Sequence, residues 1–197
     1  MSVNTLVAIA LAALFVFWAV GAYNRLVRLK NTIGNAFGQI DVLLKRRYDL
    51  IPNLVEAARK YLLHEATTLE AVTLDRNQAR GASDAVRSRP TNAAAVTTLA
   101  NAEQALTGSL ARLFLVAEAY PELMADATIR ELSEDLTSTE NKVTFARQAY
   151  NDAVLDYNNA QGEFPTLVLA RLFGFAPSAM LQATQSPEQI QTTRIQL

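Results

Sequence analysis

The chain opens with an apolar stretch that has no polar face. Residues 6–23 contain no charged side chain. As a helix, these eighteen residues would rise about 27 Å, which nearly matches the thickness of a bilayer core. The residues expected to anchor this helix are apolar or carry amphipathic rings: Leu6, Phe15, Trp18 and Tyr23. We therefore predict a transmembrane anchor over residues 6–23, after a short N-terminal segment of residues 1–5.

The charges around this stretch bear on the alternatives and on the topology. A cleaved signal peptide is one alternative, but no Lys or Arg precedes Leu6 to form its basic region. A buried core helix is the other. Arg25, Arg28 and Lys30 follow the stretch directly, and positive charge marks the cytoplasmic side of a membrane helix. We expect the lipid bilayer as a partner and the bulk of the chain in the cytoplasm.

A spacing of three and four residues between apolar positions continues outward from the anchor. Its members are Leu26, Leu29, Ile33, Ala36, Ile40, Leu43, Arg47, Leu50, Leu54, Ala57 and Tyr61, with one charged interruption. This spacing predicts a long helix that reaches about Arg80. Pro52 either kinks that helix or marks a corner at which Asp49 caps a new one. Residues 81–90 contain Gly, Ser, Asp and Pro and are expected to form a loop.

Two further helical stretches follow the predicted loop. One covers about residues 91–119, and the other begins at a cap on Asp126 and ends near Gly162. The apolar segment 164–176 is expected to cap the bundle, with a membrane surface or a partner groove as alternatives. Residues 177–197 are polar and predict a loosely ordered tail. The fold class is therefore all-α, with an N-terminal transmembrane helix and an up-and-down bundle of three to four long antiparallel helices over residues 24–163.

Composition excludes several classes of function. The chain has no Cys and one His, and Lys plus Arg number 18 against 19 for Asp plus Glu. Disulfides, thiol nucleophiles and zinc sites of Cys and His are thus excluded. The balanced charge gives no indication of nucleic-acid binding. Residues 24–80 carry ten basic and six acidic side chains, whereas residues 81–163 carry six basic and twelve acidic, which predicts attraction between the helices of one bundle.

Known catalytic motifs are incomplete or absent in this sequence. His64 and Glu65 begin like a zinc-protease helix, but Thr68 stands where the second histidine ligand is needed. No glycine-rich phosphate loop or nucleophile elbow is present. We therefore predict a protein that is not an enzyme, with no catalytic residue, metal, cofactor or small-molecule substrate.

Two patterns of small or polar residues are less easily explained. Tyr150-Asn151 and Tyr157-Asn158 recur seven residues apart on one helical face. Such asparagines either fix the register between helices or form a recognition stripe. Gly34 and Gly38 form a small-residue step that permits close approach of another backbone, either from the same bundle or from a second copy.

Several segments resemble the LemA family of bacterial membrane proteins. They are the run YNRLVRLKNTIGNAFGQIDVLLKRRYDLIPNLVEAARKYLLHE at 23–65, LEAVTLDRNQA at 69–79, VAEAYPEL at 116–123, STENKVTFARQAYNDAV at 138–154 and YNNAQGEFP at 157–165. The resemblance implies a bacterial source, one N-terminal transmembrane helix in the inner membrane and a bundle of long helices. It implies no established activity or cofactor.

The functional hypothesis is a non-enzymatic, membrane-anchored scaffold or adaptor that presents a helical bundle for protein–protein interaction or self-assembly into a homo-oligomer. The predicted partner surface combines charged residues with a helix break: Arg46, Arg47, Tyr48, Asp49, Pro52 and Asn53. Alternatively, Arg47 is paired inside the bundle with an acid of the last helix. The rival functions are an accessory subunit of a membrane protease or transporter, which is a membrane protein partner, and a membrane-remodelling protein.

Overall fold

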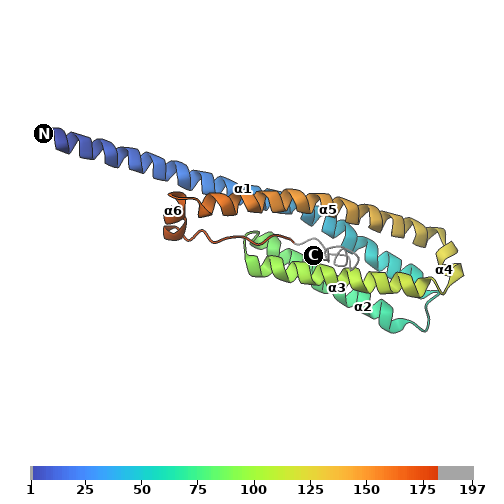
Figure 1. Cartoon of the computed structure of the whole chain (residues 1–197). Coiled ribbons are helices and arrows are strands. Elements are labelled where there is room, and N and C mark those ends of the chain that lie inside the picture. Colours follow the sequence, from blue (N-terminus) through green and yellow to red (C-terminus); the bar gives the residue numbers. More distant parts are fainter. Residues whose placement is uncertain (1, 182–197) are drawn as a thin grey trace, which may run out of the picture.

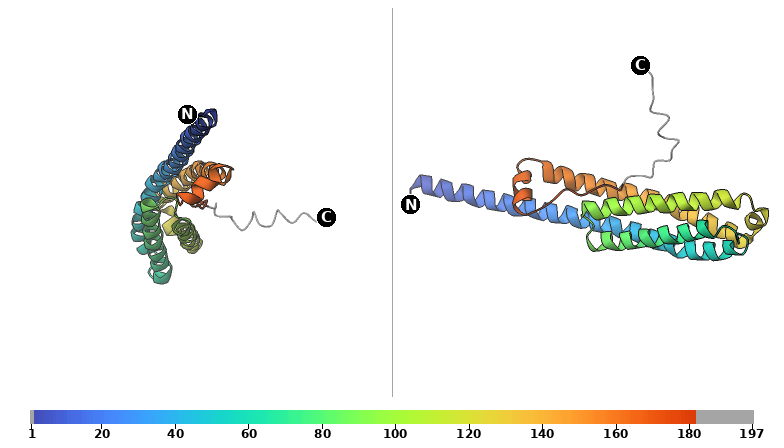
Figure 2. Two further views of the ribbon diagram at one scale, coloured as in Figure 1. Left: turned by 90° about the vertical axis from the view of Figure 1, so that its left-hand side faces the viewer. Right: turned by 90° about the horizontal axis from the view of Figure 1, so that it is seen from below.

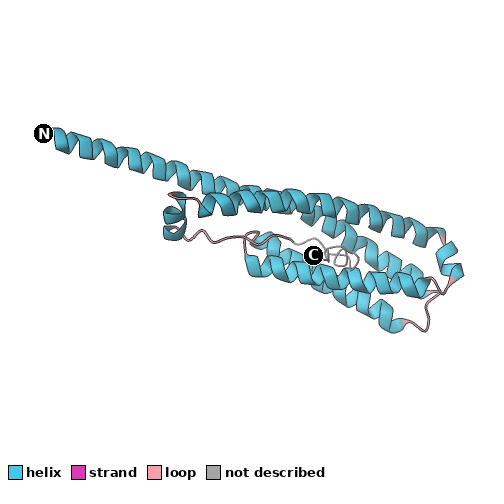
Figure 3. Ribbon diagram, viewed as in Figure 1, coloured by secondary structure: helices cyan, strands magenta, loops and turns pink. Residues whose placement is uncertain are grey.

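The computed structural model describes residues 2–181 of the chain. These residues form helices and no strand (Figures 1 and 3). The helices are α1 Val3–Arg59, α2 Ala66–Ser88, α3 Ala93–Ala117, α4 Pro121–Ala125, α5 Ala127–Gly162 and α6 Thr166–Leu172. The prediction of an all-α fold with a long apolar N-terminal helix is confirmed.

The four long helices form an up-and-down bundle. The C-terminal part of α1 and helices α2, α3 and α5 run alternately away from and back toward the N-terminal end of α1 (Figures 1 and 2). Helix α1 packs against α5 and α2, and α2 packs against α3. Helices α3 and α5 do not pack closely backbone to backbone. One side of the bundle is therefore wider than the others, and it is the side on which the candidate site lies.

The N-terminal part of α1 projects alone from the bundle (Figure 1). Its most apolar 18-residue window has a mean hydropathy of 2.4, and only 6% of that window is buried. Leu6 and Phe15 are exposed, and Trp18 is half-buried. It is the one helix in residues 2–181 that is long and apolar enough to cross a membrane.

Helix α1 continues through Pro52 to Arg59 without a break. Because proline lacks an N–H group, the carbonyl oxygen of Tyr48, four residues earlier, loses its helical donor. Arg76 of α2 supplies the missing hydrogen bond, with its Nε atom 2.8 Å from the Tyr48 oxygen. The alternative of a corner at Pro52 with Asp49 as the cap is therefore wrong.

The corner between the first two bundle helices lies at residues 60–65, so the prediction that one helix extends to Arg80 is also wrong. Residues 81–88 are helical, and the predicted loop at 81–90 is shortened to residues 89–92. Ala82, Ser83 and Val86 are buried against the bundle. Their packing outweighs the low helix propensity of Gly81. The sequence-based prediction gave this glycine too much weight as a helix breaker.

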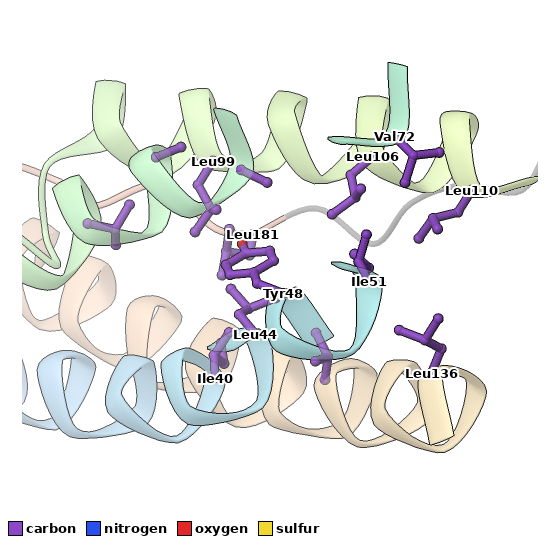
Figure 4. Packing of buried hydrophobic residues seen from close by; sticks show 14 of the residues in the cluster. Ile40, Leu44, Tyr48, Ile51, Val72, Leu99, Leu106, Leu110, Leu136 and Leu181 are labelled. Atoms are coloured by element: carbon purple, nitrogen blue, oxygen red, sulfur yellow. The ribbon is translucent and has the colours of Figure 1, made fainter. Parts of the chain in front are cut away.

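All four long helices contribute to the core. Figure 4 shows side chains of α1, α2, α3 and α5, together with one side chain from beyond α6, meeting in the centre: Ile40, Leu44, Tyr48, Ile51, Val72, Leu99, Leu106, Leu110, Leu136 and Leu181. Phe37, Leu44 and Tyr48 are buried next to the predicted seam positions of α1. The buried stripe is wider than the predicted seam because α2 and α5 cover α1 on two sides.

Asp126 caps α5 as predicted. Its carboxylate accepts hydrogen bonds from the backbone N–H of Thr128 at 2.8 Å and of Ile129 at 3.3 Å. The Tyr61 hydroxyl donates to the same carboxylate at 2.9 Å. The hydrogen bond from Tyr61 is the main cause that lowers the pKa of Asp126 below its ordinary value. This contact joins the α1–α2 corner to the start of α5.

Helix α6 and the residues after it fold back onto the bundle. Ala170 of α6 packs against Leu26 and Ala160. The chain then runs along α5 to Leu181, where Ser178 and Leu181 are 6% and 3% exposed. The prediction of a loosely ordered tail from residue 177 is therefore wrong for residues 177–181. The remainder of that prediction, residues 182–197, lies outside the described residues.

Candidate functional site

The residues predicted as a partner surface do not form one surface. Arg46, Asp49, Pro52 and Asn53 are exposed, whereas Arg47 and Tyr48 are only 4% and 1% exposed. The helix break that motivated this prediction is absent, because α1 is continuous there. Arg47 and Tyr48 contact the inside of the bundle, and only the four exposed residues are available to a partner.

Arg47 belongs to a buried polar network that joins three helices. Its Nη1 atom lies 2.7 Å from Glu103 Oε2 of α3 and 2.9 Å from Glu140 Oε2 of α5. The Tyr48 hydroxyl donates to Glu103 Oε1 at 2.5 Å, and Arg47 Nη2 donates to the hydroxyl of Thr107 at 3.1 Å. Burial, together with the negative charge of Glu103, raises the pKa of Tyr48 well above its ordinary value. The pairing of Arg47 with an acid of the last long helix was one of the alternatives open from the sequence, and Glu140 is that acid.

Glu103 is the partner that the sequence analysis missed. It is 3% exposed and lies in the apolar spacing of α3 between Leu99 and Leu106. A carboxylate at such a position is costly to bury without a cation. The sequence did contain a signal for this pair. One basic residue interrupts the apolar spacing of α1, and one acidic residue interrupts that of α3.

A second buried carboxylate joins α1 to α2. Asp41 accepts hydrogen bonds from Arg87 Nε at 2.9 Å and from Ser83 Oγ at 3.2 Å, and Lys45 Nζ lies 2.9 Å away. Burial favours the neutral acid, but the bonds from Arg87 and Lys45 outweigh it and lower the pKa of Asp41. Asp41 therefore remains charged at neutral pH and fixes the register of these two helices.

The two Tyr-Asn pairs hold an extended stretch of the chain along α5. We call this stretch, residues 175–181, the docked segment. Asn158 donates from Nδ2 to the Ser178 carbonyl at 2.9 Å and accepts from the Ser178 N–H at 2.9 Å. Asn151 makes the same two bonds to Leu181, at 3.0 Å and 2.9 Å. We call these two asparagines the ladder, because each pairs with both backbone groups of one residue.

The two tyrosines and one glutamine make further hydrogen bonds to the backbone of the docked segment. The Tyr157 hydroxyl donates to the Ala176 carbonyl at 3.0 Å, and Gln161 donates to the Phe175 carbonyl at 3.0 Å. The Tyr150 hydroxyl lies 3.2 Å from the Ala179 carbonyl. Of the two interpretations of the Tyr-Asn pairs, backbone recognition describes these contacts, and a register device between helices does not.

The spacing of the ladder matches an extended chain. Seven residues of helix separate the two asparagines and rise about 10.5 Å. Three residues separate the two residues that they bind, and three extended residues cover about 10 Å. A heptad repeat of asparagine is thus a device for binding an extended backbone in one register.

Beyond the docked segment, the side between α3 and α5 opens into a groove of about 690 Å³. We call it the distal groove, because it lies toward the α4 end of the bundle. Leu54 and Ala58 of α1, Leu113 and Ala117 of α3 and Ile129 of α5 line it with apolar atoms. Polar side chains that include Glu134 and Lys142 complete its lining. A groove of this volume lies within the range of ligand-binding clefts.

The opposite end of the bundle meets the apolar part of α1. The Tyr23 ring lies edge-on to Phe173 and Phe175, with centroids 5.1 and 5.6 Å apart, and Arg25 lies 3.6 Å from Glu163. The predicted topology residues Arg25, Arg28 and Lys30 are exposed at this level. Helix α6 and the residues that flank it expose four large apolar side chains: Phe164, Val168, Leu172 and Phe173.

These features define a class of protein, an all-α bundle carried on an apolar N-terminal helix. Among residues 2–181 there is no group of three or more side chains arranged to hold a metal ion. The LemA family model matches residues 36–196, and the chain belongs to the LemA family. Comparison with curated proteins found no match.

Proposed function

We propose that this chain is a non-enzymatic scaffold or adaptor, anchored in the bacterial inner membrane, which presents its bundle to a protein partner or to further copies of itself. The observation that supports this most directly is the continuity of α1, which contains both the apolar stretch and a central helix of the bundle. A continuous helix transmits orientation from one end to the other. The bundle is therefore held at a fixed angle to the membrane, as suits a protein that positions others.

The environment of α6 supports a second contact with the membrane. Val168 and Leu172 are spaced by four residues in α6, so their exposed side chains share one face of the helix, and the exposed Phe164 lies just before it. This face lies at the level of Tyr23, where the apolar stretch of α1 ends. Arg25, Arg28 and Lys30, which follow the apolar stretch, are exposed, and so is Arg171 of α6. Such cations favour anionic headgroups. In this proposal α6 rests in the interface and fixes the tilt of the bundle.

The adaptor proposal is tested by the mass of the full chain in lipid nanodiscs. The chain is extracted in mild detergent and reconstituted at a ratio of one copy or fewer per disc, and its mass and co-purifying proteins are determined. Several copies in one disc, or a stoichiometric protein partner, support the proposal. A monomer without a stoichiometric partner overturns it, and so does catalytic turnover by the purified chain.

The same measurement separates the adaptor from its rival. A membrane protease or transporter present in a fixed ratio to the chain would identify an accessory subunit. Four exposed substitutions on the predicted partner surface, Arg46→Ala, Asp49→Ala, Pro52→Ala and Asn53→Ala, then test the contact. Loss of the partner with an unchanged bundle assigns the contact to this surface, whereas retention assigns it elsewhere.

The membrane contact of α6 is tested by lipid quenching. Trp18 is the chain's one tryptophan, so Trp18→Phe provides a silent background. In that background Phe164→Trp is expected to be quenched by brominated lipid in nanodiscs. Phe145→Trp is the matched control, because Phe145 is 74% exposed on α5, in the lining of the distal groove. Equal quenching at the two positions, or none at Phe164→Trp, would contradict the contact.

A further inference from the structure

The last described residue, Leu181, lies inside the bundle, and the chain there runs toward the distal groove. Leu181 is 3% exposed and packs with Ile40, Leu44 and Leu99. From α6 to this point the chain runs between α5 and α3, away from the apolar end of α1 (Figure 1). The distal groove lies farther along the same two helices. Sixteen residues, 182–197, follow Leu181.

The register of the ladder predicts where those residues would lie. Ser178 pairs with Asn158 and Leu181 pairs with Asn151, so each step of three residues in the segment matches seven in α5. Continuing this relation places Thr184 beside Thr144, Pro187 beside Thr137 and Ile190 beside Arg130. Residues 129–145 of α5 include the wall of the distal groove. This relation leads from the level of Leu181 to the level of the distal groove.

The chemistry of both partners agrees with this register. Residue 144 is threonine rather than asparagine, and its hydroxyl bonds to the Glu140 carbonyl of its own helix. The ladder thus stops at Asn151, and any chain beyond it has to be held by side-chain contacts. Ile190 is the first large apolar residue after Leu181, and its expected level is that of the apolar lining around Ile129.

The length of the family match supports the same assignment. It extends through residue 196, so the sequence pattern of the family continues past Leu181. Nine residues lead from Leu181 to Ile190 and cover about 30 Å when extended. Along α5, residues 151 to 130 span about 31 Å. The distance and the chain length match.

We propose that residues 182–197 bind in the distal groove of their own chain, with Ile190 against its apolar lining. The α3–α5 side then becomes one binding site for an extended peptide, in which Asn158 and Asn151 bind the backbone and the distal groove binds side chains. The inference goes beyond the adaptor proposal, because it does not depend on any partner protein.

Disulfide trapping in the full chain tests the location. The native chain has no cysteine, so the introduced pair reports alone. Ser133 lines the distal groove, and Ser133→Cys with Ile190→Cys is expected to form an intramolecular disulfide under mild oxidation in nanodiscs. Glu131→Cys with Ile190→Cys is the matched control, since Glu131 is exposed and lies two residues away outside the groove.

Each outcome of the trapping decides the proposal. A disulfide within one chain at Ser133→Cys and not at Glu131→Cys supports it. A disulfide between two chains overturns it in favour of exchange with a second copy. No disulfide, or equal yields at both positions, also overturns it, because the segment would then have no fixed place in the groove.

A binding measurement gives an independent test that does not require cysteines. A labelled peptide of residues 182–197 is titrated against the full chain and against a chain that ends at Leu181. A tethered segment acts at a local concentration of about 1 mM. The peptide is therefore expected to bind the truncated chain at least tenfold more tightly than the full chain, and Ile190→Asp in the peptide is expected to abolish binding. Equal affinity for the two chains, or unchanged binding of the Ile190→Asp peptide, would overturn the proposal.

Discussion

The α1–α2 side and the α3–α5 side of the bundle use side chains to bind backbone in different ways. On the α1–α2 side Arg76 donates one hydrogen bond to the one carbonyl oxygen that Pro52 leaves without a donor. On the α3–α5 side Asn151 and Asn158 each make two bonds to an extended chain. Residues within a helix already satisfy their backbone groups, whereas an extended residue leaves both free. One added hydrogen bond is enough for the helix at Pro52, whereas an extended segment needs a donor and an acceptor at repeated positions.

This difference explains why one side is closed and the other is not. Two helices can close one side of a bundle by packing directly against each other, as α1 and α2 do. On the α3–α5 side the docked segment fills the space between the helices, but only as far as asparagine occupies the heptad positions of α5. Past Asn151 the ladder ends and the distal groove begins.

The largest effect is expected where the two sides meet, at Arg47. Arg47→Met leaves Glu103 buried with its main cation removed, and breaking a buried ion pair in this way costs about 3–5 kcal/mol. Arg46→Met is the matched control, because Arg46 is exposed and pairs with Asp135 at 3.4 Å; a surface pair contributes about 0–1 kcal/mol. Urea unfolding of the full chain in detergent, followed by far-UV circular dichroism, measures both. Equal losses would show that the buried network does not hold α1, α3 and α5 together.

The next largest effect tests the repair on the α1–α2 side. Arg76→Met removes a charged donor from the Tyr48 carbonyl and is expected to lower the free energy of unfolding by about 1.5–3 kcal/mol. Pro52→Ala restores a helical N–H to the same oxygen. In the Pro52→Ala background the loss caused by Arg76→Met should therefore be smaller. A double-mutant cycle by urea unfolding measures the difference, and an additive cycle would refute the repair.

Much of this architecture could be predicted from the sequence alone. The apolar stretch, the cap on Asp126 and the end of α5 near Gly162 followed from local signals. The corner at residues 60–65 did not, because it contains no Gly or Pro and depends on packing. At Pro52 the sequence left a kink and a corner open, because the group that satisfies the freed carbonyl, Arg76, comes from another helix.

The candidate site was predictable only in part. The heptad repeat of Asn151 and Asn158 was visible, but the segment that it binds, 20 to 30 residues later, was not. Residues 175–181 are mostly apolar and show no alternating strand pattern. The partner surface around Arg47 failed because burial of a charged residue depends on an acid 56 residues away. Long-range pairing is what a single sequence does not reveal.

A smaller effect is expected for the ladder itself. Asn158→Ala removes both bonds to Ser178, each contributing about 0.5–1.5 kcal/mol, while Leu181 stays held by Asn151. Hydrogen exchange of the Ser178 amide should accelerate by about tenfold, with global unfolding little changed. Asn159→Ala is the control, because Asn159 is the next residue of α5 and is exposed. Unchanged exchange in Asn158→Ala would mean that the ladder does not hold the docked segment.

The smallest effect concerns Gly38, an exposed position of α1. An added Cβ at Gly38 meets nothing within 4 Å in the chain, so close packing inside the bundle does not require this glycine. Gly38→Ala in a helix interior is expected to raise the free energy of unfolding by about 0.5–1 kcal/mol. Gly81→Ala, at another open helical position, should do the same. If the Gly34–Gly38 step admits a second copy, only Gly38→Ala will also reduce the number of copies per nanodisc. Identical copy numbers in the two variants would exclude this face as a contact between copies.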